Sequence, residues 1–499
     1  MKRLFAILIC VVCCGTAGAQ ERFDYVQRRN PWNRGMNAAG IRQDSLSRSY
    51  AEIYFMKENG GLADYSASDD SWTAGAHTSS IRHFDKISFA GRFAYDYFDG
   101  RNMCGSMFTD PGYYPVDLLE FTPGRKIREN FVLEGALAAV LAEHWTAGLK
   151  TAFSACNYAK RKDLRHKNKR LDLEVAPGLL YHRDAWAVGV AYLFGRNSER
   201  VEADEIGTSA ESYLAFLDKG LSYGVLERWD GSGTHLSESG IPGFPVREMT
   251  HGIGVQGQYG PLQVEVAWRS RSGESGERDS WWYDFDASQV TARATLTLRS
   301  SGYEHFVRVH AERERLDNRE RILRRETIDG IATVLDFGTL PIFGRRSWTA
   351  CGEYEIRSER FDLRAGLNWE RLGRRSTLCF PYVREQQLHA LAGFARGRVT
   401  CGAWEVSLGA DFRQGGFSEE AFEQDTPLEP QSAPVQLTDC YDYANEYFTA
   451  PRLGAEAGVR RNIGRFYVDL SVRWEHGFDL RRIPEADRVR ALLGVGYNF

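Results

Sequence analysis

Long apolar segments are almost absent from this 499-residue sequence. Past the amino terminus, no run approaches the roughly 18 consecutive apolar residues that a transmembrane helix needs. The mean hydropathy is correspondingly low, at -0.43. A membrane-spanning helix is thereby excluded from the rest of the chain. A transmembrane β-barrel is not excluded, because its strands carry only a weak alternation of apolar and polar residues.

Cysteines and catalytic motifs are also scarce. Three of the nine cysteines lie within the first 14 residues, and the long, irregular spacing of the others contains no CxxC and does not fix any pairing. We expect isolated thiols, with at most one bridge between surface loops. No HExxH motif, Walker loop or haem-binding CxxCH occurs in the chain. The sequence therefore predicts a non-enzymatic protein without a metal or other cofactor.

Basic charge is not in excess either. Loss of Lys2 and Arg3 with a cleaved leader would leave 61 of the 63 basic residues against 67 acidic ones. A mildly acidic chain without a basic patch is not expected to bind nucleic acid. Aromatic residues, by contrast, make up 13% of the chain, and the glycines number 49. This composition argues against a disordered chain and against a helical bundle.

The first 19 residues have the features of an export signal. A basic start at Lys2 and Arg3 is followed by an apolar stretch of suitable length, and small residues at 17–19 suit cleavage. We therefore expect residues 1–19 to be a signal peptide that directs the protein out of the cytoplasm.

Residues 466–475 show a pattern that recurs along the chain. Val468 and Leu470 share one parity with other apolar residues, whereas Ser471 and Arg473 share the opposite parity with polar ones. Side chains of a strand point alternately to its two faces, so the segment is a ribbon with one apolar and one polar face. Lipid on one side and a polar lumen on the other account for both faces. Similar segments, long enough to supply the roughly 9 to 11 residues that cross a bilayer, occur at 87–97, 262–269, 361–370 and 404–413.

Short and long connections alternate between these segments. Outer-membrane barrels have short periplasmic turns and long extracellular loops. We predict an all-β protein, a monomeric transmembrane antiparallel β-barrel of about 18 strands, with about 16 as the alternative count. Residues 20–48 would form an N-terminal segment that is periplasmic or inserted into the lumen, and residues 49–499 the barrel. The longest polar stretches, expected as extracellular loops, are 99–129, 197–247, 317–345 and 414–448.

Aromatic residues mark the expected membrane interface and the end of the chain. The final segment alternates up to its last residue, and Tyr497 and Phe499 resemble the terminal assembly signal that the barrel-insertion machinery of Gram-negative bacteria recognises. Rings close to the short turns are expected to form a girdle at the lipid headgroups. These are Phe84, Trp145, Tyr181, Trp186, Tyr259, Tyr303, Phe361, Phe466 and Tyr467.

Charged residues of both signs occupy the alternate strand positions that form the polar face. A strongly ion-selective open pore would carry rings of one sign, whereas opposite charges on neighbouring strands can pair across the wall. The mixture favours a cross-linked or plugged interior over an open channel. The charged side chains expected to face the lumen are Arg92, Asp96, Lys150, Glu265, Arg269, Arg364, Glu405, Asp411, Arg413, Asp469, Arg473 and Glu475.

The segment NPWNRGMNAAG at 30–40, followed by the barrel-like pattern up to the terminal YNF, carries a family resemblance. It resembles the large outer-membrane β-barrel proteins of Bacteroidota that form a family of unknown function. The resemblance implies the fold and location in the outer membrane. Genes of such proteins often lie near those of TonB-dependent receptors, which implies a link to uptake. It supplies no catalytic or ligand-binding residue.

Two functions are consistent with these features. We favour a non-enzymatic accessory or binding component of a cell-envelope nutrient-uptake complex. Its partners would be outer-membrane lipid, the barrel-assembly machinery, and a TonB-dependent receptor or surface lipoprotein. The alternative is a passive, porin-like channel for small polar solutes. Rings in the long loops favour binding, because they give contact area at low entropic cost; they are Tyr213, Phe216, Trp229, Phe417, Phe422, Tyr441 and Tyr443.

Overall fold

The computed structural model of the chain describes residue 23 and residues 28–204, 215–222, 227–228, 241–277, 280–328, 331–379, 382–422 and 435–499. The expected signal peptide lies outside these residues. In the described part of the chain, no helix has the length and apolar character needed to cross a membrane. Five cysteines in it are free thiols, namely Cys104, Cys156, Cys351, Cys401 and Cys440.

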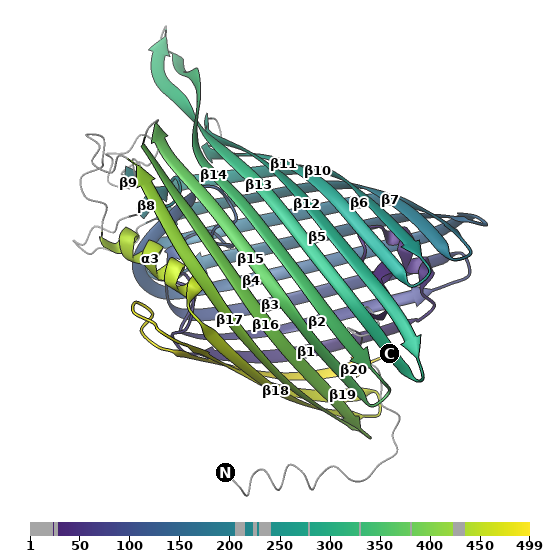
Figure 1. Cartoon of the computed structure of the whole chain (residues 1–499). Coiled ribbons are helices and arrows are strands. Elements are labelled where there is room, and N and C mark those ends of the chain that lie inside the picture. The colour runs from purple at the N-terminus through teal and green to yellow at the C-terminus, as the bar shows by residue number, and fades with distance from the viewer. Residues whose placement is uncertain are drawn as a thin grey trace, which may run out of the picture.

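Eighteen long strands pair antiparallel and close into one transmembrane barrel (Figure 1). Each strand pairs with the next along the chain, β7 pairs with β10, and β20 returns to β1. The predicted fold and strand number are confirmed. The barrel strands are β1 (Arg48–Asn59), β2 (Asp70–His83), β3 (Ile87–Ser106), β4 (Asp117–Ala142), β5 (Trp145–Lys160), β6 (Arg165–Arg183), β7 (Trp186–Asp204), β10 (Ile241–Tyr259), β11 (Leu262–Glu277), β12 (Ser280–Ser300), β13 (Tyr303–Ile328), β14 (Ile331–Arg357), β15 (Phe361–Cys379), β16 (Tyr382–Cys401), β17 (Trp404–Phe422), β18 (Arg452–Ile463), β19 (Phe466–Gly477) and β20 (Asp487–Asn498).

The sequence alternation sorts side chains to the two faces of the wall. In β19, Leu470 is 51% exposed on the outer face, and Val472 and Trp474 lie beside it on the same face. The intervening Ser471 and Arg473 are less exposed and face the lumen. An apolar outer face is what contact with lipid requires.

Tyr467 departs from the predicted aromatic girdle. Its ring is only 1% exposed and lies inside the barrel, where the hydroxyl donates a hydrogen bond to Glu52 at 2.7 Å. The guanidinium of Arg460 stacks on the ring at 3.5 Å. Other girdle residues, such as Phe84 and Tyr259, are exposed on the outer face. Strand parity, and not distance from the turn, decides on which side of the wall a ring lies.

Several strands continue well beyond the membrane. β4, β13 and β14 have 26, 26 and 27 residues, more than twice the roughly 9 to 11 that a bilayer requires. The outer parts of β13 and β14, from Arg319 to Pro341, form a projecting hairpin that we call the arm (Figure 1). The stretches 99–129 and 317–345, predicted as loops, are therefore largely paired strand.

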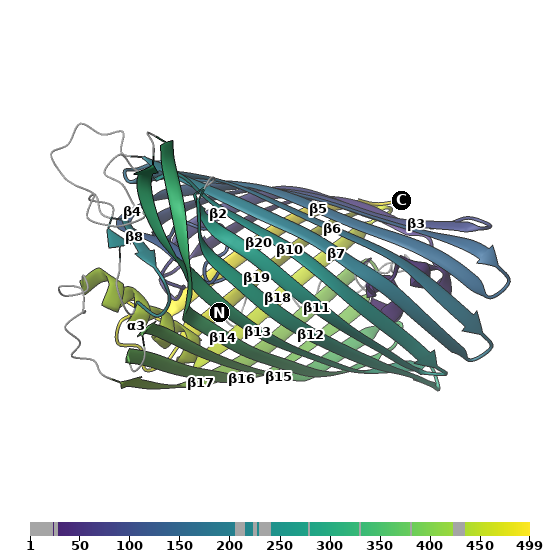
Figure 2. The ribbon, with the colours of Figure 1, turned by 90° about the horizontal axis from the view of Figure 1, so that it is seen from above.

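Shorter elements occupy both ends of the barrel. The 3-10 helices η1 (Pro31–Arg34) and η2 (Ala38–Gln43) lie within it at the end opposite α3 (Figure 2). At the α3 end, β8 (Ala215–Asp218) pairs with β4, and β9 (Glu227–Arg228) pairs with β8. The helix α3 (Val435–Thr449) contacts β16 and β17.

Candidate functional site

Residues 28–43 form a segment inside the lumen that we call the plug. The amide of Asn37 donates a hydrogen bond to the backbone carbonyl of Leu179 at 2.9 Å. The backbone amide of Met36 donates to the carboxylate of Glu265 at 3.1 Å. These contacts are specific to one position of the plug, because a buried donor must meet its acceptor directly.

Two arginines hold the ends of the plug. Arg28 lies 3.5 Å from Glu355 and 3.9 Å from Asp362, and all three side chains are less than a tenth exposed. Arg42 donates to the backbone carbonyl of Phe84 at 2.8 Å. Loss of one partner from the Arg28 cluster would leave a buried charge uncompensated, which is strongly destabilising.

Glycines in the wall make room for the plug. A methyl group added at Gly148 would come within 2.1 Å of the backbone nitrogen of Ala39. One added at Gly254 would come within 1.6 Å of the sulfur of Met36. At Gly148 only a residue without a Cβ atom permits this approach, because the neighbour is backbone, whereas at Gly254 the neighbour is the flexible side chain of Met36. The stretch at 30–40 that carries the family resemblance is thus a lumenal segment to which the wall sequence is fitted.

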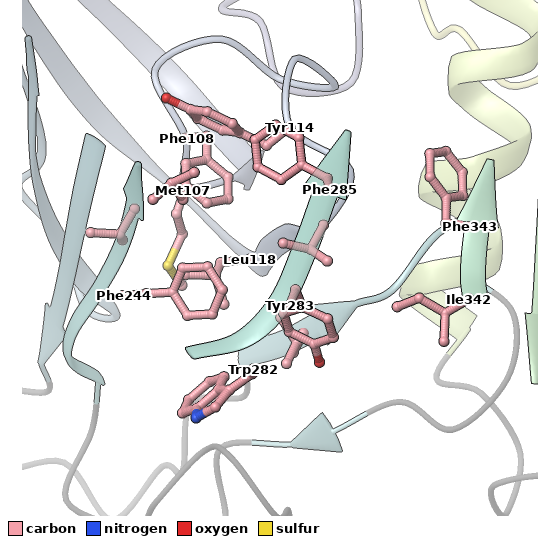
Figure 3. Packing of buried hydrophobic residues seen from close by; sticks show 14 of the residues in the cluster. Met107, Phe108, Tyr114, Leu118, Phe244, Trp282, Tyr283, Phe285, Ile342 and Phe343 are labelled. Carbon is pink, nitrogen blue, oxygen red and sulfur yellow. The ribbon is translucent and has the colours of Figure 1, made fainter. Parts of the chain in front are cut away.

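The opposite end is covered by a cap made of residues 107–116, β8 with residues 219–222, and α3. Leu437 of α3 packs against Leu119 and Phe216. Each large apolar side chain buried in this way contributes roughly 1.5 to 3 kcal/mol, so the cap is a packed part of the barrel. Figure 3 shows the core that the cap shares with the wall, including Met107, Phe108, Tyr114, Leu118, Phe244, Tyr283, Phe285 and Phe343.

Two rings that were predicted for exposed loop surfaces belong to the packed cap instead. Phe216 is fully buried, and Tyr441 packs against the shared core. Phe417 is exposed on β17, and the Tyr443 hydroxyl reaches the backbone carbonyl of Gly61 at 3.5 Å. The loops that carry Phe216 and Tyr441 fold inward because their rings find apolar partners there. Tyr213, Trp229 and the side chain of Phe422 lie outside the described residues.

Between the plug and the cap is a cavity of about 1210 Å³, which we call the chamber. Its wall is the inner face of β13 to β19, and the cap forms its outer side. Seven arginines line it, namely Arg345, Arg364, Arg374, Arg396, Arg413, Arg452 and Arg473. Nine carboxylates line it as well, namely Asp64, Asp110, Asp117, Asp218, Glu314, Glu353, Glu370, Asp411 and Glu475.

Five of the charged residues predicted to face the lumen meet in the chamber. Arg473 lies between Asp411 at 2.8 Å and Glu475 at 2.7 Å. Arg413 is ion-paired with a carboxylate of β15, and Arg364 is close to one of β14. Opposite charges on neighbouring strands therefore cross-link this part of the wall.

The other seven are not brought together. Lys150 donates to the backbone carbonyl of Gly35 at 3.5 Å, and Glu265 accepts from Met36, so both contact the plug. The remaining five are spread around the wall: Arg92 beside Glu134, Asp96 beside Tyr54, Arg269 opposite Gly252, Glu405 beside Arg398, and Asp469 beside Arg460.

Four chamber arginines are missing from the predicted set. Arg345 and Arg452 lie within or next to stretches that were predicted as loops. Arg374 continues the polar parity of 360–370, so two more steps of the same alternation would have found it. Arg396 lies on β16, where alanine and glycine occur on both faces and hide the alternation.

Three chamber carboxylates lie at the cap, beyond the membrane-spanning part of the wall. Burial raises the pKa of Asp64 and of Asp218. Burial also raises the pKa of Asp117 to about 7, although the Ser106 hydroxyl donates a hydrogen bond to it at 2.7 Å. Asp117 faces Asp218 directly across the β4 and β8 pair, which adds to the rise. Asp117 is therefore partly protonated near neutral pH.

Eighteen paired strands, an apolar outer face and a polar lumen define a transmembrane β-barrel of the outer-membrane type. The chain belongs to a family of unknown function (DUF6850), whose profile matches residues 38–499. The match begins at η2 and includes all eighteen barrel strands. A comparison with curated proteins finds no match.

Solved structures with similar folds share little sequence with this chain. CdiB from Acinetobacter baumannii has a TM-score of 0.37 and 8% identity, with 91% of this chain and 61% of that chain covered. The chain thus spans less than two thirds of that protein. The ferric enterobactin receptor PfeA from Pseudomonas aeruginosa has a TM-score of 0.41 and 8% identity, with 91% and 81% covered. BauA, the ferric preacinetobactin receptor from Acinetobacter baumannii, has a TM-score of 0.41 and 7% identity, with 91% and 80% covered.

Proposed function

We propose that the protein resides in the outer membrane as a non-enzymatic binding or accessory component of a nutrient-uptake complex. The observation that carries this proposal is that folded elements occupy the lumen at both ends. The plug is held by buried ion pairs and hydrogen bonds, and the cap shares a hydrophobic core with the wall. A passive pore needs a continuous path through the barrel, whereas the plug fills part of the lumen at one end and the cap covers part of the other end.

The arm is the surface on which we place the partner. It projects beyond the barrel and exposes Phe337, Leu340 and Ile322 to solvent. An isolated two-stranded hairpin is only marginally stable in water, and clustered exposed apolar side chains are typical of interaction sites. A TonB-dependent receptor or a surface lipoprotein is the class of partner that we propose.

The proposal includes the route to the membrane and the source of the protein. The basic and apolar start of the chain supports export through a signal peptide at 1–19. The paired last strand, with Tyr497 and Phe499 on its outer face, supports insertion by the barrel-assembly machinery. The stretch at 30–40 supports an origin in Bacteroidota.

A passive, porin-like channel is the second candidate. Two further cavities, of about 490 and 670 Å³, lie beside the plug, and the smaller one shares Cys351 and Glu353 with the chamber. If these spaces joined, small polar solutes would pass along the plug without displacing it.

Conductance in planar bilayers separates the two candidates. The purified protein should give little steady current, and a variant that lacks residues 28–43 should conduct. Stable open channels from the unaltered protein would favour the passive channel and contradict the accessory role.

Mild detergent extraction from the native host tests the partner. We expect an outer-membrane protein to co-purify with the unaltered chain and to be lost when Phe337→Ser and Leu340→Ser are combined. Thr339→Ser, on the same arm, is the matched control and should retain it. Recovery of the same partner with all three chains would show that the arm is not the contact.

A further inference from the structure

Arginines oppose one another directly across neighbouring strands of the chamber wall. Side chains at such positions have Cβ atoms about 4.5 to 5.5 Å apart, and like charges there are destabilising. An arginine cannot escape this repulsion by losing its proton, because the guanidinium remains charged in proteins. Three opposed pairs line the chamber: Arg345 with Arg374, Arg364 with Arg396, and Arg413 with Arg452.

One member of each pair has a carboxylate partner and the other has none. The neutralised members are Arg345 with Glu314 at 2.8 Å, Arg364 with Glu353 at 4.0 Å, and Arg413 with Glu370 at 3.0 Å. Among the residues that the structure describes, no carboxylate lies within ion-pair distance of Arg374, Arg396 or Arg452. We call these three the unpaired arginines.

Neutral groups orient the unpaired arginines without cancelling their charge. The Nε of Arg374 donates a hydrogen bond to Gln386 at 2.6 Å. The guanidinium of Arg452 lies over the ring of Tyr447, in the last turn of α3, at 4.3 Å. Such cation–π contacts hold a guanidinium in place while its outer N–H groups stay free to donate.

In the described part of the chain, no chamber carboxylate forms an ion pair with an unpaired arginine. Burial raises the pKa of Asp64, Asp117 and Asp218, while the nearby charge of Arg452 lowers the pKa of Asp64 and that of Arg374 lowers the pKa of Asp218. The other six are already engaged by arginines: Asp110 by Arg170, Glu314 by Arg345, Glu353 by Arg308, Glu370 by Arg413, and Asp411 and Glu475 by Arg473. The guanidiniums that no carboxylate engages in an ion pair are therefore those of Arg374, Arg396 and Arg452, with Asp218 and Asp64 interacting with the first and the last at longer range.

The unpaired arginines lie at three different levels of the wall, on β15, β18 and β16. Arg374 is opposite Gln386 of β16, and Arg413, the partner of Arg452, is opposite Ala392. Arg396 lies four residues further along β16. At about 3.3 Å per residue, the three levels span roughly 33 Å along the strand direction, beginning near the cap. They form a track and not a single point.

We propose that the chamber binds an elongated oligoanion, whose carboxylate or phosphate groups are spaced along a chain and meet Arg374, Arg452 and Arg396 in turn. Guanidinium groups bind both kinds of anion through two parallel N–H bonds. The chamber volume of about 1210 Å³ exceeds the roughly 300 to 1,000 Å³ of common small-molecule pockets. A chain of several units fits this size.

This inference deepens the proposed binding role, and equilibrium binding to the purified barrel tests it independently of conductance. The probes are tetragalacturonate for carboxylates, tripolyphosphate for phosphates, and uncharged maltotetraose as the control. We expect at least one anionic probe to bind, with an affinity that falls as salt is raised, and maltotetraose not to bind. Binding of only one of the two anions shows whether the site prefers carboxylate or phosphate groups. Binding of both shows that negative charge is sufficient for recognition.

Substitutions locate the site. Arg374→Gln, Arg396→Gln and Arg452→Gln should each weaken binding by about tenfold, because each removes a charge-assisted contact. Arg490→Gln is the matched control. Arg490 also opposes an arginine, Arg473, but it is ion-paired with Glu58 at 2.6 Å and does not line the chamber. The Arg490→Gln variant should bind the anionic probe with the affinity of the unaltered protein.

Three results would overturn the inference: no binding of either anion, equally tight binding of maltotetraose, or an equal loss in Arg490→Gln. A barrel that is closed in bilayers yet binds no anion would leave the accessory role standing. A barrel that conducts yet binds anions through these arginines would contradict the accessory role and leave the anion site standing. Heat-modifiable migration of each variant shows that it has folded.

Discussion

Leu470 and Ser471 are neighbours in β19 that face different solvents. Leu470→Arg places a charge on the lipid side near mid-bilayer and should lower the free energy of unfolding by roughly 2 to 4 kcal/mol. Ser471→Arg enters a lumen that already holds Arg473 and Asp469, so its cost should be much smaller. Urea unfolding in lipid vesicles, followed by heat-modifiable mobility, measures both. Equal losses would show that the two faces are wrongly assigned.

Asp117 makes the stability of the cap depend on pH. In the unfolded chain its carboxyl ionises near the ordinary pKa of 3.8, whereas in the folded protein burial raises the pKa to about 7. The folded state thus holds the extra proton, and stability falls as pH rises between these values. Asp117→Asn removes this cost and should gain up to about 4 kcal/mol at pH 8, since a shift of one pKa unit corresponds to about 1.4 kcal/mol.

Urea midpoints measured at pH 8 and below pH 4 test this expectation, because the gain should vanish at the lower pH. Asp110→Asn is the control, since Asp110 lies in the same cap with a largely exposed side chain. A gain of equal size at both pH values would mean that ionisation of Asp117 is not its cause.

Strand parity could be predicted for single residues, but their partners could not. The side of the wall on which Leu470 or Arg364 lies follows from alternation alone. That Arg364 faces Arg396 depends on the register of β15 with β16, which is fixed by the turn between them. Whether an arginine has a carboxylate nearby depends on the next strand as well. The unpaired arginines therefore emerge only from the complete sheet.

Gly148 tests how far the plug depends on the wall. Gly148→Val would collide with the backbone of Ala39, so the plug should be displaced while the barrel still forms. Displacement should appear as increased conductance and as new protease cleavage within 28–43. Gly352→Val is the control, because an added Cβ there meets open space on the outer face. If Gly148→Val conducts no more than Gly352→Val, the plug is not held by this close approach.

The last strand tests closure. Phe499 donates its backbone amide to the carbonyl of Ser49 at 2.9 Å, and Tyr497 packs between Phe466 and Phe499. Deletion of residues 497–499 should abolish the heat-modifiable form in the outer membrane, while the exported chain still accumulates. Normal membrane levels of folded barrel after this deletion would rule out an assembly role for these residues.

The lengths of the elements were harder to predict than their existence. Alternation marks a strand only where one face meets lipid and the other a polar lumen. Beyond the membrane both faces of β13 and β14 meet water, so the pattern disappears while the backbone pairing continues as far as Ile328 and Ile331. The inward fold of the cap has the same origin, because the apolar side chains of 107–116 give no periodic signal.

At the scale of the whole molecule, the strand count and the closed fold followed from a simple rule. Short and long connections alternate, and each crossing reverses the chain. The plug motif was visible in the sequence as a stretch without strand pattern. Its place in the lumen depends on glycines such as Gly148 and Gly254, which are far away in the sequence and look like ordinary strand glycines.

The filling of the barrel is eccentric. η2 contacts β3 to β6, and the cap core rests largely on β7, β10 and β12, so packed elements cover much of this arc of the wall. The arc from β13 to β19 borders the chamber. Backbone amides exchange hydrogen faster where openings meet water and few apolar contacts resist them.

Hydrogen–deuterium exchange in lipid nanodiscs should therefore divide the barrel along its length. Amides of β15 to β18 should exchange faster than those of β5 to β10 at the same depth, and an oligoanion in the chamber should slow the first set only. Uniform protection around the circumference would contradict this division. A solute in this barrel would lie off the central axis, against the more readily exchanging arc of β13 to β19, with the packed arc on its other side.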